Sequence, residues 1–152
     1  MDAPPLERDL LFLIHDVARM MRTRIDQWAR RHEMTRAQWA ILMRLERHPG
    51  ISQAELAALI EVEPISVARL IDRLEAKDLV ERRPDPDDRR LRRLHLRPAS
   101  KPILKEIKRC KAQLNDLMMA DIPLHAREAV AEVLLQIKAN LTATAEAARS
   151  QS

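Results

Sequence analysis

The sequence has a single glycine and no tyrosine, and only 2% of its 152 residues are aromatic. Glycine provides the backbone angles of tight turns, and aromatic residues are common in strands, so their scarcity argues against an all-β fold. Residues that favour helices, such as alanine, leucine, arginine and glutamate, are abundant instead. We therefore expect a mainly α-helical protein in which any sheet is small.

Further absences indicate the cellular compartment of the protein. Cys110 is the one cysteine, which excludes an intrachain disulfide and suits a reducing environment. No apolar run approaches the roughly 20 residues that span a bilayer. The acidic start, MDAPPLERDL, also lacks the charge pattern of a signal peptide. Together these features predict a cytoplasmic protein with no membrane partner.

Features of enzymes and metal sites are missing too. Gly50 is the only glycine, so the chain has no glycine-rich phosphate loop. The five histidines are scattered, and none has another histidine or a cysteine at the spacing of metal ligands. Asp87 and Asp88 stand beside arginines, which lower carboxylate pKa values and are unsuited to a general acid. We expect no catalytic residues, no metal site and no cofactor, and hence no enzyme.

Charge is plentiful by contrast: 33% of the residues are charged, the formal net charge is +4, and the pI is about 9.7. Such a modest basic excess permits a polyanionic partner without requiring one.

Apolar residues three and four positions apart predict a series of helices. The first runs from about Leu10 to His32, and the second begins at Thr35. Ser52 and Glu55 form a capping-box pattern at the start of a short third helix, and Pro64 stands where the first turn of a fourth helix tolerates it. Two further helices follow residue 98. The last carries one apolar seam, at Val130, Leu134, Ile137 and Leu141.

Between the fourth and fifth helices, residues 80–97 show the alternation of two short strands. The strands "LVERR" and "RRLHLR" predict a hairpin with Leu94 and Leu96 facing inward. Its glycine-free connection contains carboxylates that can accept hydrogen bonds and so rigidify the turn. The arginines suit DNA phosphates or a narrow minor groove, and the phosphate candidates are Arg82, Arg83, Arg92 and Arg93. The alternative is a solvated, charge-balanced turn.

The fourth helix, residues 64–77, has two distinct faces. Val67, Leu70, Ile71 and Leu74 form its apolar stripe, and Ser66, Arg69 and Arg73 lie well away from it with Ile65 nearby. Arginine pairs with guanine, serine contacts base edges or phosphates, and apolar groups meet the thymine methyl in the major groove. A short capped helix, a turn and this helix form a helix-turn-helix, and the hairpin adds a wing. An ordinary amphipathic helix with a solvated polar face remains the alternative.

The stretch from residue 52 to residue 96, SQAELAALIEVEPISVARLIDRLEAKDLVERRPDPDDRRLRRLHL, resembles the MarR family of winged helix-turn-helix transcription factors. The resemblance rests on "RLIDRLEAKDLVERR", the "DPDDRR" turn and the "LHL" strand, and the helix order extends it over nearly the whole chain. It implies a winged helix-turn-helix over residues 35–98 and a helical dimerisation region formed by residues 1–34 and 99–152. The family's Asp-x-Arg maps onto Asp88, which would brace the turn, and Arg90, which would enter the minor groove.

The pattern and the resemblance together give one set of DNA-contacting candidates: Ser52, Gln53, Pro64, Ile65, Ser66, Arg69, Arg73, Arg83, Asp88, Arg89 and Arg90. Two positions depart from the family pattern. Asp78 stands where glycine is usual, and Arg97 replaces a threonine that caps the fifth helix. Aspartate tolerates left-handed backbone angles, so we expect the fourth helix to end there at some strain.

The terminal helices carry more apolar surface than a monomer of this size readily covers, and the resemblance implies a homodimer on a palindromic DNA operator. A second group of candidates concerns a small-molecule effector: Phe12, His15, Arg19, Arg22, Trp39 and Met43. An aromatic ring, an imidazole and two cations suit an aromatic carboxylate or another anion. A solvated basic face is the alternative interpretation.

These observations predict a homodimeric, sequence-specific DNA-binding regulator, acting as a repressor that a small aromatic or anionic effector releases. Two alternatives remain open. One is a redox-responsive regulator that uses Cys110, whose neighbouring cations could lower its pKa. The other is an architectural module that binds double-stranded DNA without sequence preference.

Overall fold

A computed structural model describes residues 5, 8–60 and 62–149 of the chain. Six helices and one antiparallel hairpin are described, in the order α1 (Leu10–Arg31), α2 (Arg36–Arg47), α3 (Gln53–Ile60), α4 (Pro64–Ala76), β1 (Val80–Pro84), β2 (Arg92–Leu96), α5 (Ser100–Met119) and α6 (Leu124–Arg149). The expected fold class, mainly helical with a small hairpin, is confirmed. The described residues divide into two compact units between Leu114 and Asn115.

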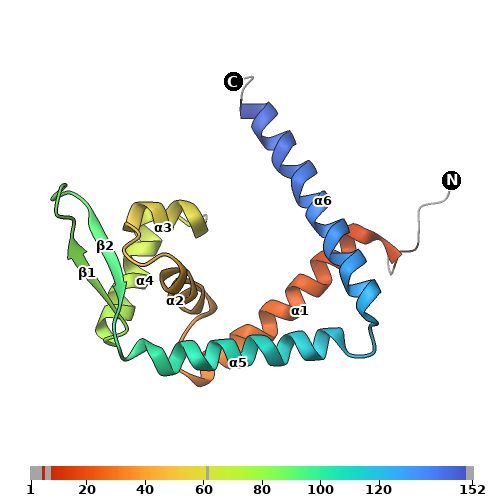
Figure 1. The fold of residues 1–152 in the computed structure, drawn as a ribbon, viewed down its shortest axis with the longest axis horizontal. Coiled ribbons are helices and arrows are strands. Elements are labelled where there is room, and N and C mark those ends of the chain that lie inside the picture. The colour runs from red at the N-terminus through yellow and green to blue at the C-terminus, as the bar shows by residue number, and fades with distance from the viewer. Residues whose placement is uncertain (1–4, 6–7, 61, 150–152) are drawn as a thin grey trace. The chain divides into compact units, whose positions relative to one another are not determined.

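In the first unit, α2, α3 and α4 gather beside the hairpin (Figure 1). The side chains between them are apolar and fully enclosed, and the largest are Ile41, Leu42, Leu45, Leu56, Ile71, Leu74 and Leu94. Burying a side chain of this size stabilises a fold by roughly 1.5–3 kcal/mol. This core fixes α4 against α3 and the hairpin, and it thereby sets which face of α4 remains outside.

Local capping explains where the helices begin. Thr35 caps α2 in a capping box with Gln38. The predicted box at α3 is confirmed, because Glu55 N–H donates to Ser52 Oγ (3.1 Å) and Ser52 N–H donates to the Glu55 carboxylate (2.8 Å). These bonds satisfy N–H groups that the first turn of a helix leaves without partners.

Among the described residues, three other than glycine have left-handed backbone angles: Glu33, Asp78 and Asp121. Asp78 follows the end of α4 with a φ of +59°. This left-handed angle was predicted because Asp78 stands where the family usually has glycine. The one glycine, Gly50, has a φ of +77° and precedes α3. A Cβ at Gly50 would lie 3.3 Å from His95 Cε1, so both its angle and its close contact favour glycine.

The hairpin pairs Val80 with Leu96 and Pro84 with Arg92. Leu94 is fully buried and Leu96 is half-buried, in line with the predicted inward face. The segment before α3 joins the sheet along β2, because Gly50 N–H donates to the Leu94 carbonyl and Leu94 N–H donates to the Ile51 carbonyl (both 3.0 Å). The wing is therefore attached to the start of the helix-turn-helix as well as to its end.

The second unit comprises the end of α5 and all of α6. Arg127 donates to the carbonyls of Ile122 (2.7 Å) and Met119 (2.9 Å), so a cation satisfies acceptors at the end of α5. Of the predicted seam of α6, Val130, Leu134 and Leu141 are exposed and Ile137 is half-buried.

Candidate nucleic-acid interface

The outer face of α4 is built as its periodicity predicts. Val67, Ile71 and Leu74 are buried, and Leu70 is half-buried. The opposite face is exposed and carries every candidate that the sequence placed there: Pro64, Ile65, Ser66, Arg69 and Arg73. Ile65 exposes 64% of its surface on this face, so an apolar group stands beside the two arginines.

The turn of the wing is organised around Asp85. One oxygen of its carboxylate accepts the N–H groups of Asp87 (2.8 Å) and Asp88 (2.9 Å), and the other accepts Nε of Arg93 (2.6 Å). The Arg93 guanidinium, followed by these two N–H groups, lowers the pKa of Asp85. A carboxylate thus provides the turn geometry that glycine commonly provides.

Asp88 also braces the turn, by accepting Arg90 N–H at 2.9 Å. We expected Asp88 and its neighbouring carboxylate Asp87 to brace the turn, but the buried Asp85 was not among the predicted residues. The pattern Asp-Pro-Asp-Asp could have indicated it, since aspartate side chains commonly accept N–H bonds from residues two or three positions later. As a result of both braces, Arg89 and Arg90 stand exposed at the tip.

Two of the predicted phosphate-binding arginines are bound within the protein instead. Arg82 donates to Gln53 Oε1 (3.0 Å), to the Ala68 carbonyl (3.1 Å) and to Glu75, and its Nη2 lies 2.8 Å from Asp72 Oδ1. It therefore joins β1 to both α3 and α4. The prediction for Arg82 was wrong because a half-buried guanidinium with four protein partners is not free to bind a phosphate.

Arg93 is the second correction. Besides Asp85, it contacts the Gly50 carbonyl (3.3 Å) and the Glu55 carboxylate (3.4 Å). It thus ties β2 to the turn of the wing and to the start of α3. Arg83 and Arg92 are exposed, although Arg83 also pairs with Glu81 and lowers the pKa of that carboxyl.

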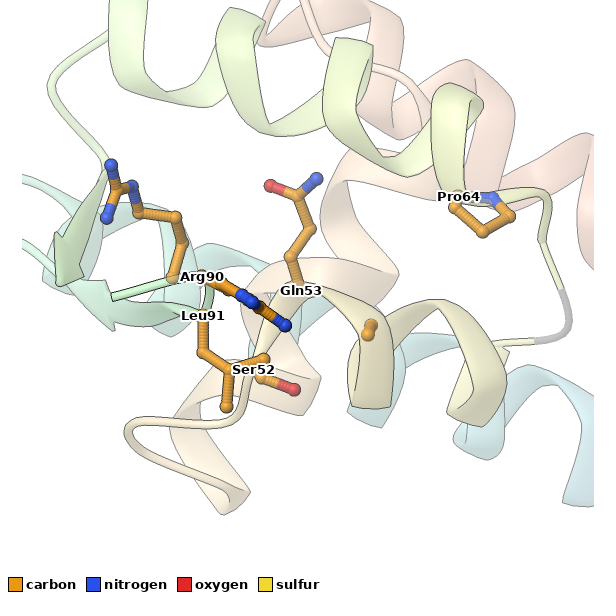
Figure 2. A pocket seen from close by; sticks show the side chains of 7 residues that line it. Ser52, Gln53, Pro64, Arg90 and Leu91 are labelled. Atoms are coloured by element: carbon orange, nitrogen blue, oxygen red, sulfur yellow. The ribbon is translucent and has the colours of Figure 1, made fainter. Parts of the chain in front are cut away.

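Between α3, α4 and the wing lies a hollow of about 230 Å³ (Figure 2). Residues from all three elements line it, and several are predicted DNA contacts: Ser52, Gln53, Ala54, Pro64, Arg90, Leu91 and Arg92. Ser52 is buried and its hydroxyl accepts the Glu55 N–H, so its side chain acts mainly as a helix cap. The side-chain carbonyl oxygen of Gln53 accepts a hydrogen bond from Arg82 Nε. Because an amide nitrogen only donates, the other half of Gln53 is suited to an acceptor such as a phosphate oxygen.

The candidate effector residues are not brought together within one chain. Phe12, His15 and Arg19 are exposed on the first half of α1, Arg22 and Met43 are half-buried, and Trp39 is buried. The Trp39 ring lies 6.0 Å from that of His32 at the end of α1. At 1.5 Å per residue, Phe12 is about 30 Å along the helix from His32. Trp39 Nε1 is buried and has no hydrogen-bond partner among the residues that the structure describes.

Cys110 lies on the inner face of α5 with 2% of its surface exposed. Burial raises the pKa of its thiol, the nearby Glu106 carboxylate adds to this, and the cations Arg109 and Arg31 oppose it more weakly. A reactive thiolate needs the opposite environment. Within the described part of the chain, no three His, Cys, Asp or Glu side chains are grouped to hold a metal ion, and no helix is long and apolar enough to cross a membrane.

Residues 34–91 match the model of the MarR family, and they span α2, α3, α4 and the strand β1 with the turn that follows. This segment of the chain is a MarR family domain. A crystal structure of MarR superposes with a TM-score of 0.79 at 26% identity, covering 94% of this chain and 97% of the other. An uncharacterised HTH-type transcriptional regulator of Bacillus subtilis (strain 168), YybA, is 24% identical over 109 residues, which are 72% of this chain and 73% of YybA.

MepR of S. aureus, solved as a complex with DNA, has the same fold, with a TM-score of 0.76 at 19% identity and coverage of 89% of this chain and 98% of MepR. The family match and the likeness to MarR support a DNA-binding transcriptional regulator of the MarR family, and the fold is a winged helix-turn-helix. The predicted resemblance to the MarR family is confirmed.

Proposed function

We propose that this MarR family regulator reads a specific palindromic operator as a homodimer and represses a nearby operon until a small molecule releases it. The observation that carries the proposal is the pairing of two cationic elements on one rigid frame. The outer face of α4 offers Ser66, Arg69 and Arg73, and the wing offers Arg89 and Arg90. Arg82 and Arg93 fix the frame from within.

The two elements have different roles in this proposal. Arg69 and Arg73 pair with guanine edges in the major groove, Ser66 meets a base edge or a phosphate, and Ile65 meets a thymine methyl. Arg90 enters the adjacent minor groove, where a narrow groove has an enhanced negative potential. Arg83, Arg89 and the Gln53 amide contact phosphates, which adds affinity without reading sequence.

Uncovered apolar surface supports the homodimer. On α1 the exposed apolar residues are Leu10, Leu11, Phe12, Leu13, Ile14, Val17 and Met20. On α6 they are Leu124, Val130, Val133, Leu134, Leu135 and Leu141. Patches of this extent are commonly buried in an interface. In the proposal, the regions 1–34 and 99–152 of two copies cover one another, and the two α4 helices reach half-sites ~34 Å apart.

The small molecule that releases repression is, in this proposal, an aromatic or anionic compound. Trp39, with its unpaired and buried Nε1, lies beside His32, and His32 Nε2 lies 3.5 Å from the Glu106 carboxylate. An unpaired buried donor is costly, and a ligand oxygen would satisfy it. Phe12, His15, Arg19, Arg22 and Met43 stay candidates, with the partner copy bringing the first half of α1 into reach. An effector acts only if it binds one arrangement of the dimer more tightly than the other.

The test starts with selection of bound fragments from the source genome, followed by affinity measurements on the selected site and on a scrambled one. Arg69→Ala should reduce the preference for the selected site by roughly 1–3 kcal/mol, whereas Arg90→Ala should weaken both and lower the salt slope by about one. Aromatic acids are then added to the preformed complex to test release. Equal affinity for every duplex would instead favour the architectural alternative, and a monomer at micromolar concentration would contradict the two-site arrangement.

A further inference from the structure

Arg97 stands at a junction of four elements. It follows β2 directly, and its N–H donates to the Leu79 carbonyl just before β1 (2.9 Å). Its own carbonyl accepts two bonds from Ser100, the first residue of α5, one from the N–H (2.9 Å) and one from Oγ (2.7 Å). Ser100 is buried, so this connection is fixed. The Arg97 backbone is therefore attached to both strands of the wing and to α5.

The side chain of Arg97 adds the fourth element. Its Nε lies 2.7 Å from Asp78 Oδ1, and its Nη1 donates to Glu81 Oε2 (3.0 Å). Asp78 follows the last turn of α4, and Glu81 belongs to β1. The approach to Asp78 is not aligned as a directed hydrogen bond, so this contact acts mainly through charge. One guanidinium thus joins the end of the recognition helix α4 to the base of the wing.

Asp78 is an unfavourable residue for its backbone position. Its φ of +59° lies in the left-handed region, which glycine adopts more readily than any residue with a Cβ. The ordinary role of a residue here, ending the helix, needs no carboxylate. The Asp78 carboxylate instead contacts Arg97. Arg97 in turn stands where the family pattern has threonine. The two departures from that pattern contact each other.

We propose that Asp78 and Arg97, assisted by Glu81, are positioning residues for DNA binding. The pair sets the angle between α4 and the wing, so that Arg69 and Arg90 engage their two grooves at once. This inference rests on the proposed function, because it assigns the pair to that same DNA-binding surface. Neither residue touches DNA itself.

The decisive variant is Asp78→Gly, which removes the carboxylate and also relieves the backbone strain. We expect its melting temperature to be equal to or above that of the wild type, while its affinity for the selected operator falls about two- to fivefold, the range of a solvent-exposed ion pair. A purely structural role would move stability and affinity in the same direction. Unchanged affinity in Asp78→Gly would overturn the proposal.

A matched control is Asp121→Gly, which relieves the same φ of +59° in the loop before α6, outside the winged helix-turn-helix. Its affinity for DNA should match that of the wild type. Arg97→Ala should lose as much affinity as Asp78→Gly, the double variant should lose no more than either, and Arg97→Lys should recover part of the loss. Additive losses in the double variant would show that the two residues act separately.

The link to the wing is tested with Arg90→Ala in both backgrounds. If the pair positions the wing, Arg90→Ala should reduce DNA affinity by a smaller factor in the Asp78→Gly background than in the wild type. The reason is that the wing of Asp78→Gly is already misplaced. An equal cost in both backgrounds contradicts the proposal. If the wild type itself binds no site preferentially, the proposed function and this inference fail together. If the wild type is specific and responds to Arg69→Ala, an unaffected Asp78→Gly removes only the positioning role.

Discussion

Arg93 and Asp85 form the central contact of the wing, with 2.6 Å between Nε and Oδ2, although they lie on opposite sides of the turn. The remaining oxygen of Asp85 fixes the two N–H groups that follow the proline at residue 86. Together these bonds let a turn without glycine present Arg89 and Arg90 in one orientation. The order of the arginine tip therefore depends on an arginine that is not itself available to DNA.

The first prediction concerns this contact. Arg93→Ala leaves the Asp85 carboxylate without its main partner, so the turn should loosen and trypsin should cleave at Arg89 and Arg90 faster than in the wild type. Arg83→Ala removes an exposed arginine of the opposite strand that pairs with Glu81, outside the turn, and should leave the rate unchanged. Because the pKa of Asp85 is lowered, the protection should persist as pH falls from neutral to 5. Equal cleavage of both variants would show that the contact does not order the turn.

The second prediction separates structural from exposed arginines. Arg82→Ala removes a side chain that is 20% exposed and leaves partners on α3 and α4 unpaired, so the free energy of unfolding should fall by about 1–3 kcal/mol. Arg83→Ala, one residue along β1, removes a side chain that is 58% exposed and should cost less than ~0.5 kcal/mol. Urea denaturation of both variants provides the comparison. The reverse order would mean that Arg82 does not join β1 to the helices.

The third prediction concerns the redox alternative. Since burial raises the pKa of the Cys110 thiol, iodoacetamide should modify the folded protein at pH 7 much more slowly than the urea-unfolded chain. The rate should rise only at a pH above the ordinary range of a thiol. The wild type should keep its DNA affinity after treatment with peroxide, and Cys110→Ala should behave in the same way. Rapid alkylation of the folded protein, or a loss of DNA affinity with peroxide in the wild type that Cys110→Ala abolishes, would restore the redox-responsive alternative.

The fourth prediction concerns the dimer. Leu134→Glu places a charge in the exposed seam of α6 and should shift the protein towards the monomer, because a charge buried without a partner is costly. Gln136→Glu adds the same charge two positions away, on another side of the helix, and should leave the association state unchanged. Sedimentation velocity across micromolar concentrations distinguishes them. If both variants remain dimeric, the seam is not the interface.

The features that sequence predicted well depend on neighbours within one helical turn. The Ser52–Glu55 capping box, the two faces of α4 and the left-handed Asp78 all belong to this group, because local spacing and backbone preference determine them. The exposed arginines of the wing tip were also found.

The roles of individual arginines were not predictable in the same way. Arg82 contacts Gln53, 29 positions away, and Arg93 contacts Gly50, 43 positions away. Nothing in a run of arginines shows which one reaches such a partner. Helix α1 gives a related case. Its apolar residues Leu10, Ile14 and Val17 have the three- and four-residue spacing of a core face, but they are exposed. A pattern indicates which face seeks burial without saying whether the same molecule covers it.

The two edges of the hairpin carry a final consequence. Backbone groups at residues 50 and 51 pair with β2, and on the other side the Glu75 carboxylate accepts the Arg82 N–H of β1 (2.9 Å). Unpaired strand edges invite further strands to add, which leads to aggregation. Because these backbone groups are already hydrogen-bonded near the base of the wing, few remain to pair with the wing of another copy bound nearby on the same duplex.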